Sequence, residues 1–118
     1  MSMNEPLGSV QSFEQFVLLS VVELSTDGVT PAHSYDVTER AKERIDDLDR
    51  PPFGGIERRE VITALRNLAE AGLLAKTETE DAVGKGRPAY ELAVEADGVL
   101  DSLSEDDDVG SYARSLAV

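Results

Sequence analysis

The segment 13–24 constrains the fold more than any other part of this 118-residue chain. It has helical spacing, Ser12 can cap its start, and apolar residues occur on nearly every side of the predicted helix. A helix that is apolar all round must be buried on two sides. Because the chain is short, we expect a partner subunit to cover the second side. One face carries Phe13, Phe16, Val17, Val21 and Leu24, and another carries Leu18, Leu19 and Val22.

Two more helices are predicted in the centre of the chain. The first covers about 34–48, with one apolar stripe and with its charged residues from 36 to 44, Arg40 and Arg44 included, facing solvent. Prolines and glycines at 49–55 break this pattern. The second covers about 57–71, and Gly72 ends it. Its expected buried face is Val61, Ile62, Leu65, Leu68 and Ala69, and its expected exposed stripe is Arg59, Thr63, Arg66 and Glu70.

A β-hairpin and two short helices are predicted after Gly72. Strands are expected at 73–80 and 89–92, around a glycine-rich loop at 81–88. Apolar spacing then predicts helices over 96–103 and 109–116, with an acidic break at 104–108 between them. We therefore expect an α+β fold with a flexible N-terminus at 1–10, a winged helix-turn-helix domain at 11–103, and an acidic linker with a short C-terminal dimerisation helix at 104–118.

The charge of the chain is strongly negative and unevenly distributed. Eleven basic and 24 acidic residues give a net charge of −13, which ordinarily argues against nucleic-acid binding. Ten of the 11 basic residues, however, lie within 33–93. Many carboxylates with only three Lys against eight Arg are typical of proteins that work in molar salt, where the screening length falls to roughly 3 Å. The alternative to a salt-adapted protein is an ordinary acidic protein that interacts with other proteins.

The predicted helix at 57–71 is the one with several exposed arginines near its N-terminus. A helix fits the major groove of DNA, where Arg reads the O6 and N7 atoms of guanine, and helix N-terminal amides favour phosphate. The loop at 81–88 adds Lys85 and Arg87, which can lie along the DNA backbone or in an adjacent minor groove. The order of three helices and a hairpin predicts that these features share one surface of a winged helix-turn-helix.

Three stretches of the chain resemble the PadR-like winged-helix transcriptional regulators. They are SYDV at 34–37, VITALRNLAEAGL at 61–73 and GRPAYEL at 86–92, and the last two are the more specific pair. The resemblance covers about 13–103, and the acidic composition is similar to that of haloarchaeal members. It implies a homodimer that binds a pseudo-palindromic operator in duplex DNA and regulates transcription, in an oxidative or other stress response.

Because acidic groups crowd the expected DNA interface, we expect cations to bridge carboxylates and phosphates there.

The resemblance also assigns roles to individual residues. The DNA-contacting residues are Arg58, Arg59 and Thr63 on the third helix, Ser34 and Tyr35 at phosphates, and Lys85 and Arg87 on the wing, with Arg66 added from the same exposed stripe. The dimer is expected to use Phe13, Phe16, Val17, Leu24, Tyr112 and Leu116 of the first and last helices.

Each assignment has a plainer structural alternative. Arg66 can pair with a glutamate one turn later, and Ser34 can be only a helix N-cap. Lys85 and Arg87 can belong to an ordinary hairpin turn, and Tyr35 can be a core residue. For the whole chain, the alternative function is a winged-helix protein-interaction module that does not bind DNA.

Enzymatic, metal-binding and membrane functions are not expected. The chain has no Cys and a single His, and Gly84, Lys85 and Gly86 do not make a P-loop motif. The acidic run at 106–108 lacks the spacing of a calcium loop. The longest uncharged apolar run, 16–22, is too short to span a bilayer, and residues 1–30 lack the basic start of a signal peptide. We expect a cytoplasmic protein without a cofactor.

Overall fold

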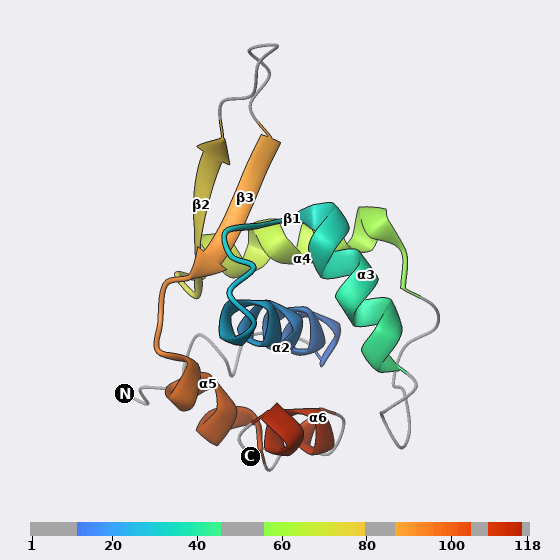
Figure 1. Ribbon diagram of the computed structural model, residues 1–118, viewed down its shortest axis with the longest axis vertical. Helices are drawn as coiled ribbons and strands as arrows, with labels where there is room; N and C mark the ends of the chain where they lie inside the picture. Colours follow the sequence, from blue (N-terminus) through green and yellow to red (C-terminus); the bar gives the residue numbers. More distant parts are fainter. Residues whose placement is uncertain (1–11, 46–55, 80–86, 105–108, 117–118) are drawn as a thin grey trace.

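All five helices expected from the sequence are present in the computed structural model, which describes residues 12–45, 56–79, 87–104 and 109–116. With a three-stranded antiparallel sheet they make a small compact α+β fold (Figure 1). The expected N-terminal segment 1–10, the end of the second helix with the break at 49–55, and the acidic run at 106–108 lie outside the described residues. In chain order the elements are α2 (Ser12–Thr26), β1 (Ala32–His33), α3 (Ser34–Arg44), α4 (Arg58–Glu70), β2 (Leu74–Thr79), β3 (Arg87–Leu92), α5 (Ala96–Leu103) and α6 (Gly110–Leu116).

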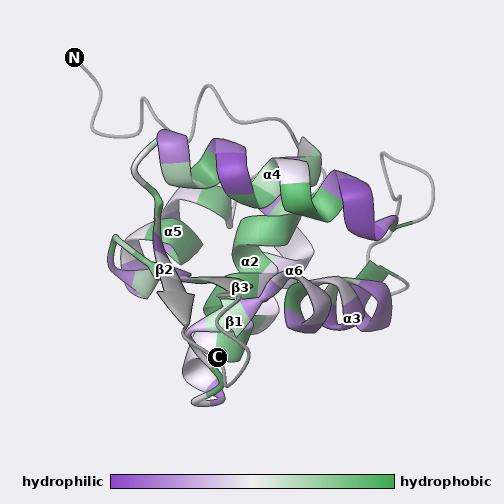
Figure 2. Cartoon of the chain, turned by 90° about the horizontal axis from the view of Figure 1, so that it is seen from above, coloured by the Kyte–Doolittle hydropathy of each residue, from purple (hydrophilic) through white to green (hydrophobic). Residues whose placement is uncertain are grey.

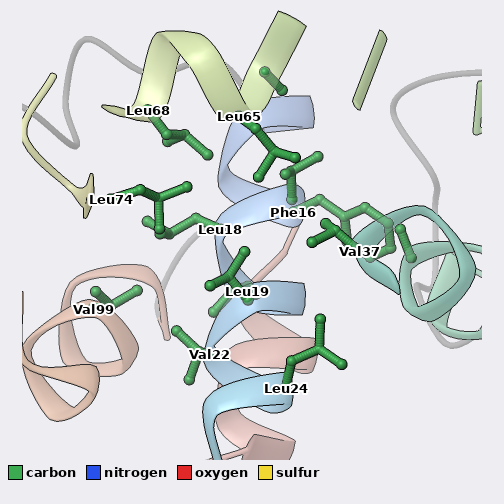
Figure 3. Close-up of a cluster of buried hydrophobic side chains, with 14 of the residues drawn as sticks. Phe16, Leu18, Leu19, Val22, Leu24, Val37, Leu65, Leu68, Leu74 and Val99 are labelled. Carbon is green, nitrogen blue, oxygen red and sulfur yellow. The ribbon is translucent and has the colours of Figure 1, made fainter. Parts of the chain in front are cut away.

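Helix α2 forms the centre of the core. Every residue of 16–22 is fully buried, including Ser20, whose hydroxyl donates a hydrogen bond to the carbonyl of Phe16 at 3.2 Å. Helices α3 and α4 and strand β3 pack against α2, and so do α5 and α6. Figure 3 shows its side chains reaching toward several elements at once, among them Leu65 and Leu68 of α4, Val37 of α3 and Val99 of α5.

The second side of α2 is covered by the same chain, which corrects the expectation that a partner subunit lies there. Helices α5 and α6 lie against α2 at the end of the molecule opposite the hairpin (Figure 1). Of the six expected dimer residues, Phe13 and Leu116 are half-buried at the margin of the core. The other four are at most 3% exposed and have no surface left for a second subunit: Phe16, Val17, Leu24 and Tyr112.

The sheet has the strand order β1-β3-β2 and links the hairpin to the helices. Strands β2 and β3 form the predicted hairpin, in which Leu74 pairs with Leu92. The two-residue strand β1 is absent from the sequence prediction, because two residues show no periodicity. It pairs Ala32 with Tyr90 of β3 and leads directly into α3. The start of α3 is therefore held beside the hairpin.

The end of α4 is set by a glycine, as the sequence predicts. Gly72 has a φ of +85°, a left-handed conformation that strains other residues. The N–H of Leu73 donates to the carbonyl of Leu68 at 3.0 Å, and the N–H of Gly72 donates to that of Ala69 at 3.1 Å. These two bonds make a Schellman motif, which satisfies the last carbonyls of the helix. The chain then turns directly into β2.

A buried carboxylate on α2 joins three helices. Glu23 accepts hydrogen bonds from Nε and Nη2 of Arg44 at 2.9 and 2.5 Å and from the hydroxyl of Tyr112 at 2.7 Å, and Arg40 lies 3.1 Å away. Burial alone would raise the pKa of Glu23. The hydrogen bonds from Arg44 and Tyr112 and the two arginine charges outweigh burial and hold the pKa below its usual range. Glu23 is therefore an ionised link between α2, α3 and α6.

We expect Glu23→Gln to lower the free energy of unfolding by roughly 1.5–3 kcal/mol at neutral pH, because charge-assisted hydrogen bonds are lost. The folded-state pKa of Glu23 lies below its ordinary value of 4.5. Its contribution is therefore complete above pH 4.5 and is lost as the pH falls through the folded-state pKa. Urea unfolding at one salt concentration, from neutral pH to about pH 3, should show the gap to wild type narrowing.

The matched control is Glu43→Gln, because Glu43 is exposed and lies 3.8 Å from Arg40. This change should alter the free energy of unfolding by less than about 0.5 kcal/mol. Equal losses in the two variants, or a gap that widens in acid, would contradict the role given to Glu23.

Candidate nucleic-acid interface

Helix α4 divides cleanly into a buried and an exposed face. Val61, Ala64, Leu65 and Leu68 are buried, and α2 packs against the helix. The predicted outer stripe is confirmed, because all four of its members are exposed. Seen from above in Figure 2, hydrophilic residues colour both ends of α4. The exposed stripe consists of Arg59, Thr63, Arg66 and Glu70.

The arginines of α4 have little electrostatic compensation. The Arg59 side chain is 90% exposed, and its Nη2 lies 3.9 Å from a carboxylate oxygen of Glu57. An exposed pair at that distance is weak. Arg58 and Arg66 are also exposed and form no ion pair with any other residue that the structure describes, so the alternative pairing of Arg66 with Glu70 is not present there.

The exposed Arg66 of α4 acts electrostatically on a residue of the sheet. Burial raises the pKa of Tyr90 in β3, and the positive charge of Arg66 opposes that rise. Helix α4 also packs against β2, so α4 and the base of the hairpin are neighbours.

The arginines of α3 have a different environment, which the sequence analysis missed. It placed Arg40 and Arg44 in solvent, whereas both bind carboxylates of α2 or the turn after it. Nη1 of Arg40 lies 2.7 Å from the Oδ2 of Asp27, and Arg44 binds Glu23. The only advance signal is Glu23 itself, a charge within an otherwise apolar segment. The positive charge of α3 is therefore neutralised, and that of α4 is not.

The start of α3 presents an exposed aromatic residue beside the hairpin. His33 is the N-cap residue, and its backbone N–H donates a hydrogen bond to Oδ2 of Asp36 at 3.1 Å. The alternative that Ser34 is the N-cap is wrong, because Ser34 is the first residue of the helix and its carbonyl accepts a hydrogen bond from the Thr38 hydroxyl. Tyr35 is 57% exposed and is therefore a surface residue.

Ile62 is a correction to the predicted core. The sequence analysis placed it on the buried face of α4, but the structure leaves it 38% exposed. Val61, the residue before it, is fully buried. A step of about 100° per residue carries Ile62 from the buried face to the edge of the outer face.

The hairpin extends away from the helices in the upper half of Figure 1, on the same side as α4 and the start of α3. The backbone of Arg87 pairs with that of Thr79 in the β2–β3 ladder. The side chain of Arg87 and the whole of Lys85 lie outside the described residues. The structure thus places the start of α3 beside β3 and packs α4 against β2 at the base of the hairpin.

Other kinds of site receive no support from the described part of the chain. Among its residues, no group of three or more His, Asp or Glu side chains is arranged to hold a metal ion. None of its helices has the length and apolar character needed to cross a membrane. Comparison with known proteins finds no protein family whose pattern matches the chain and no curated protein with significant similarity to it.

The two faces of α4 should differ sharply in their contribution to stability. We expect Arg59→Ala and Arg66→Ala to change the free energy of unfolding by no more than about 0.5 kcal/mol, because both side chains are exposed. Leu65→Ala, on the fully buried face, should cost about 2–5 kcal/mol. Urea unfolding measures all three. A large loss in either arginine variant would mean that the outer face serves the fold.

Proposed function

We propose that this protein is a PadR-like winged helix-turn-helix regulator that binds duplex DNA sequence-specifically and acts on transcription in high salt. The observation that carries the proposal is the exposed stripe of α4, with Arg58 beside it. A helix enters the major groove of DNA, and Arg there pairs with guanine O6 and N7. Thr63 lies between Arg59 and Arg66 on the same stripe and is the third candidate for a base contact.

In this proposal the remaining elements position α4. Tyr35 at the start of α3 contacts a phosphate, as Ser34 does through its exposed edge, and the β2–β3 hairpin is the wing. Phosphate contacts fix register and orientation, whereas base contacts select sequence. The pairing of β1 with β3 supports this arrangement, because it holds the start of α3 next to the proposed wing.

The proposed regulator is a homodimer on a pseudo-palindromic operator. Two α4 helices then lie about one DNA turn apart, near 34 Å. Because the single chain buries the other expected interface residues, the dimer contact proposed here uses Phe13 and Leu116 at the margin of the core. A role in an oxidative stress response requires a route other than thiol oxidation, because the chain has no Cys.

The first test is an operator-binding measurement. Duplexes are selected from a random pool in parallel at low and at molar KCl, and affinities for the selected sequence are measured by fluorescence anisotropy. Arg59→Ala should weaken binding by roughly 1–3 kcal/mol and relax base preference at one position. The matched control is Lys42→Ala, which removes one charge from an exposed residue of α3 that lies near Glu39.

Equal effects of Arg59→Ala and Lys42→Ala would reject base readout by α4. Selection of no duplex at all would favour the alternative, a winged-helix module that binds a basic protein partner through its acidic surface.

The second test is the salt dependence of binding. DNA-binding proteins ordinarily lose affinity steeply as salt rises, through counterion release. In a chain of net charge −13, we expect cations to be taken up between carboxylates and phosphates, so that binding persists at about 1 M KCl. Measuring affinity for the selected duplex as a function of KCl concentration tests this expectation. A steep negative slope, with binding lost below about 0.5 M, would contradict this expectation.

A further inference from the structure

Ile62 is an apolar side chain placed among the arginines of α4. The structure exposes four large apolar side chains among its described residues, and Ile62 is the one on this helix. Arg58 and Arg66 lie four residues to either side of it, and Arg59 lies three residues before it. Residues three and four apart on a helix are surface neighbours. Ile62 is therefore bordered by all three arginines of α4.

Exposure alone does not assign a role to Ile62, because single exposed apolar residues are common on protein surfaces. Its position does. An isoleucine can neither donate nor accept a hydrogen bond, so on a helix that lies in the major groove it distinguishes bases only by apolar contact. The 5-methyl group of thymine is the apolar group at the major-groove edge of the base pairs.

We infer that Ile62 contacts the 5-methyl group of a thymine in the operator and so selects thymine at that position. The inference rests on the proposed function, since it requires α4 to lie in the major groove. The neighbouring arginines supply the polar base contacts of the proposed function, and Ile62 adds base preference without a polar contact. Burying one methyl group against it should strengthen binding about three- to fivefold.

The test removes that methyl group from the DNA. Each thymine of the selected operator is replaced in turn by deoxyuridine, which differs from thymidine only in lacking the 5-methyl group. Wild-type protein should lose about three- to fivefold in affinity at one position of each half-site. Ile62→Ala should bind the thymine operator correspondingly less tightly and should show no further loss with uracil at that position.

Val94→Ala is the matched control. Val94 is also 38% exposed, but it lies between β3 and α5 and is not part of α4. This variant should keep the full uracil effect, and thermal unfolding of both variants should match that of wild type. An equal uracil effect in wild type and Ile62→Ala overturns the inference, as does a wild-type affinity unchanged by uracil at every position, and in both cases the proposed function stands. If no duplex is selected, the inference and the proposed function both fail.

Discussion

The burial of α2 on all sides is the constraint on which the rest of the structure depends. Its apolar residues occur around nearly the whole helix, so no single partner element can cover them. Helices α3 and α4 and strand β3 cover one part, and α5 and α6 cover the rest. Because each of these elements packs on α2, its position relative to the others is set by one common helix. The exposed stripe of α4 is held in place by the same contacts that bury the opposite face.

The ion pairs of the described residues distinguish the arginines of α3 from those of α4. Arg40 and Arg44 of α3 bind carboxylates of α2 and of the turn that follows it. Glu23 on α2 also accepts a hydrogen bond from the hydroxyl of Tyr112. These contacts serve the packing of α3 and α6 on α2. The arginines of α4 lie on its exposed face, and among the described residues the one ion pair they make is the weak contact of Arg59 with Glu57 at 3.9 Å. The arginines that stabilise the fold thus lie on α3, and the arginines that remain available to a ligand lie on α4.

Much of the fold could be predicted from the sequence because the deciding signals are local. Gly72 ends α4 where expected, and the apolar spacing of α5 and α6 places both helices correctly. Long-range contacts could not be predicted in this way. The hydroxyl of Tyr112 and the carboxylate of Glu23 are 89 residues apart in the chain, and no local pattern joins them.

The candidate site was predicted less completely than the fold, for two physical reasons. An apolar helix indicates that two sides are covered but not which chain covers them. The sequence analysis therefore assigned the second side of α2 to a partner subunit, whereas α5 and α6 of the same chain lie there. Ile62 lies at the border between the two faces of α4, where helical spacing does not decide between burial and exposure. Arg59 and Thr63 lie at the centre of the outer face, and there the same spacing is decisive.

The elements of the proposed interface are joined by short, well-defined links, and these links affect the entropic cost of binding a ligand. Strand β1 ties the start of α3 to β3, and the Schellman motif at Gly72 ties the end of α4 to β2. These links hold the start of α3 at β3 and the end of α4 at β2 in the structure without a ligand. Binding then requires little ordering of the backbone, which lowers its entropic cost. A ligand of regular spacing, such as the groove and phosphates of duplex DNA, suits such a preorganised face better than a surface that needs the protein to adapt.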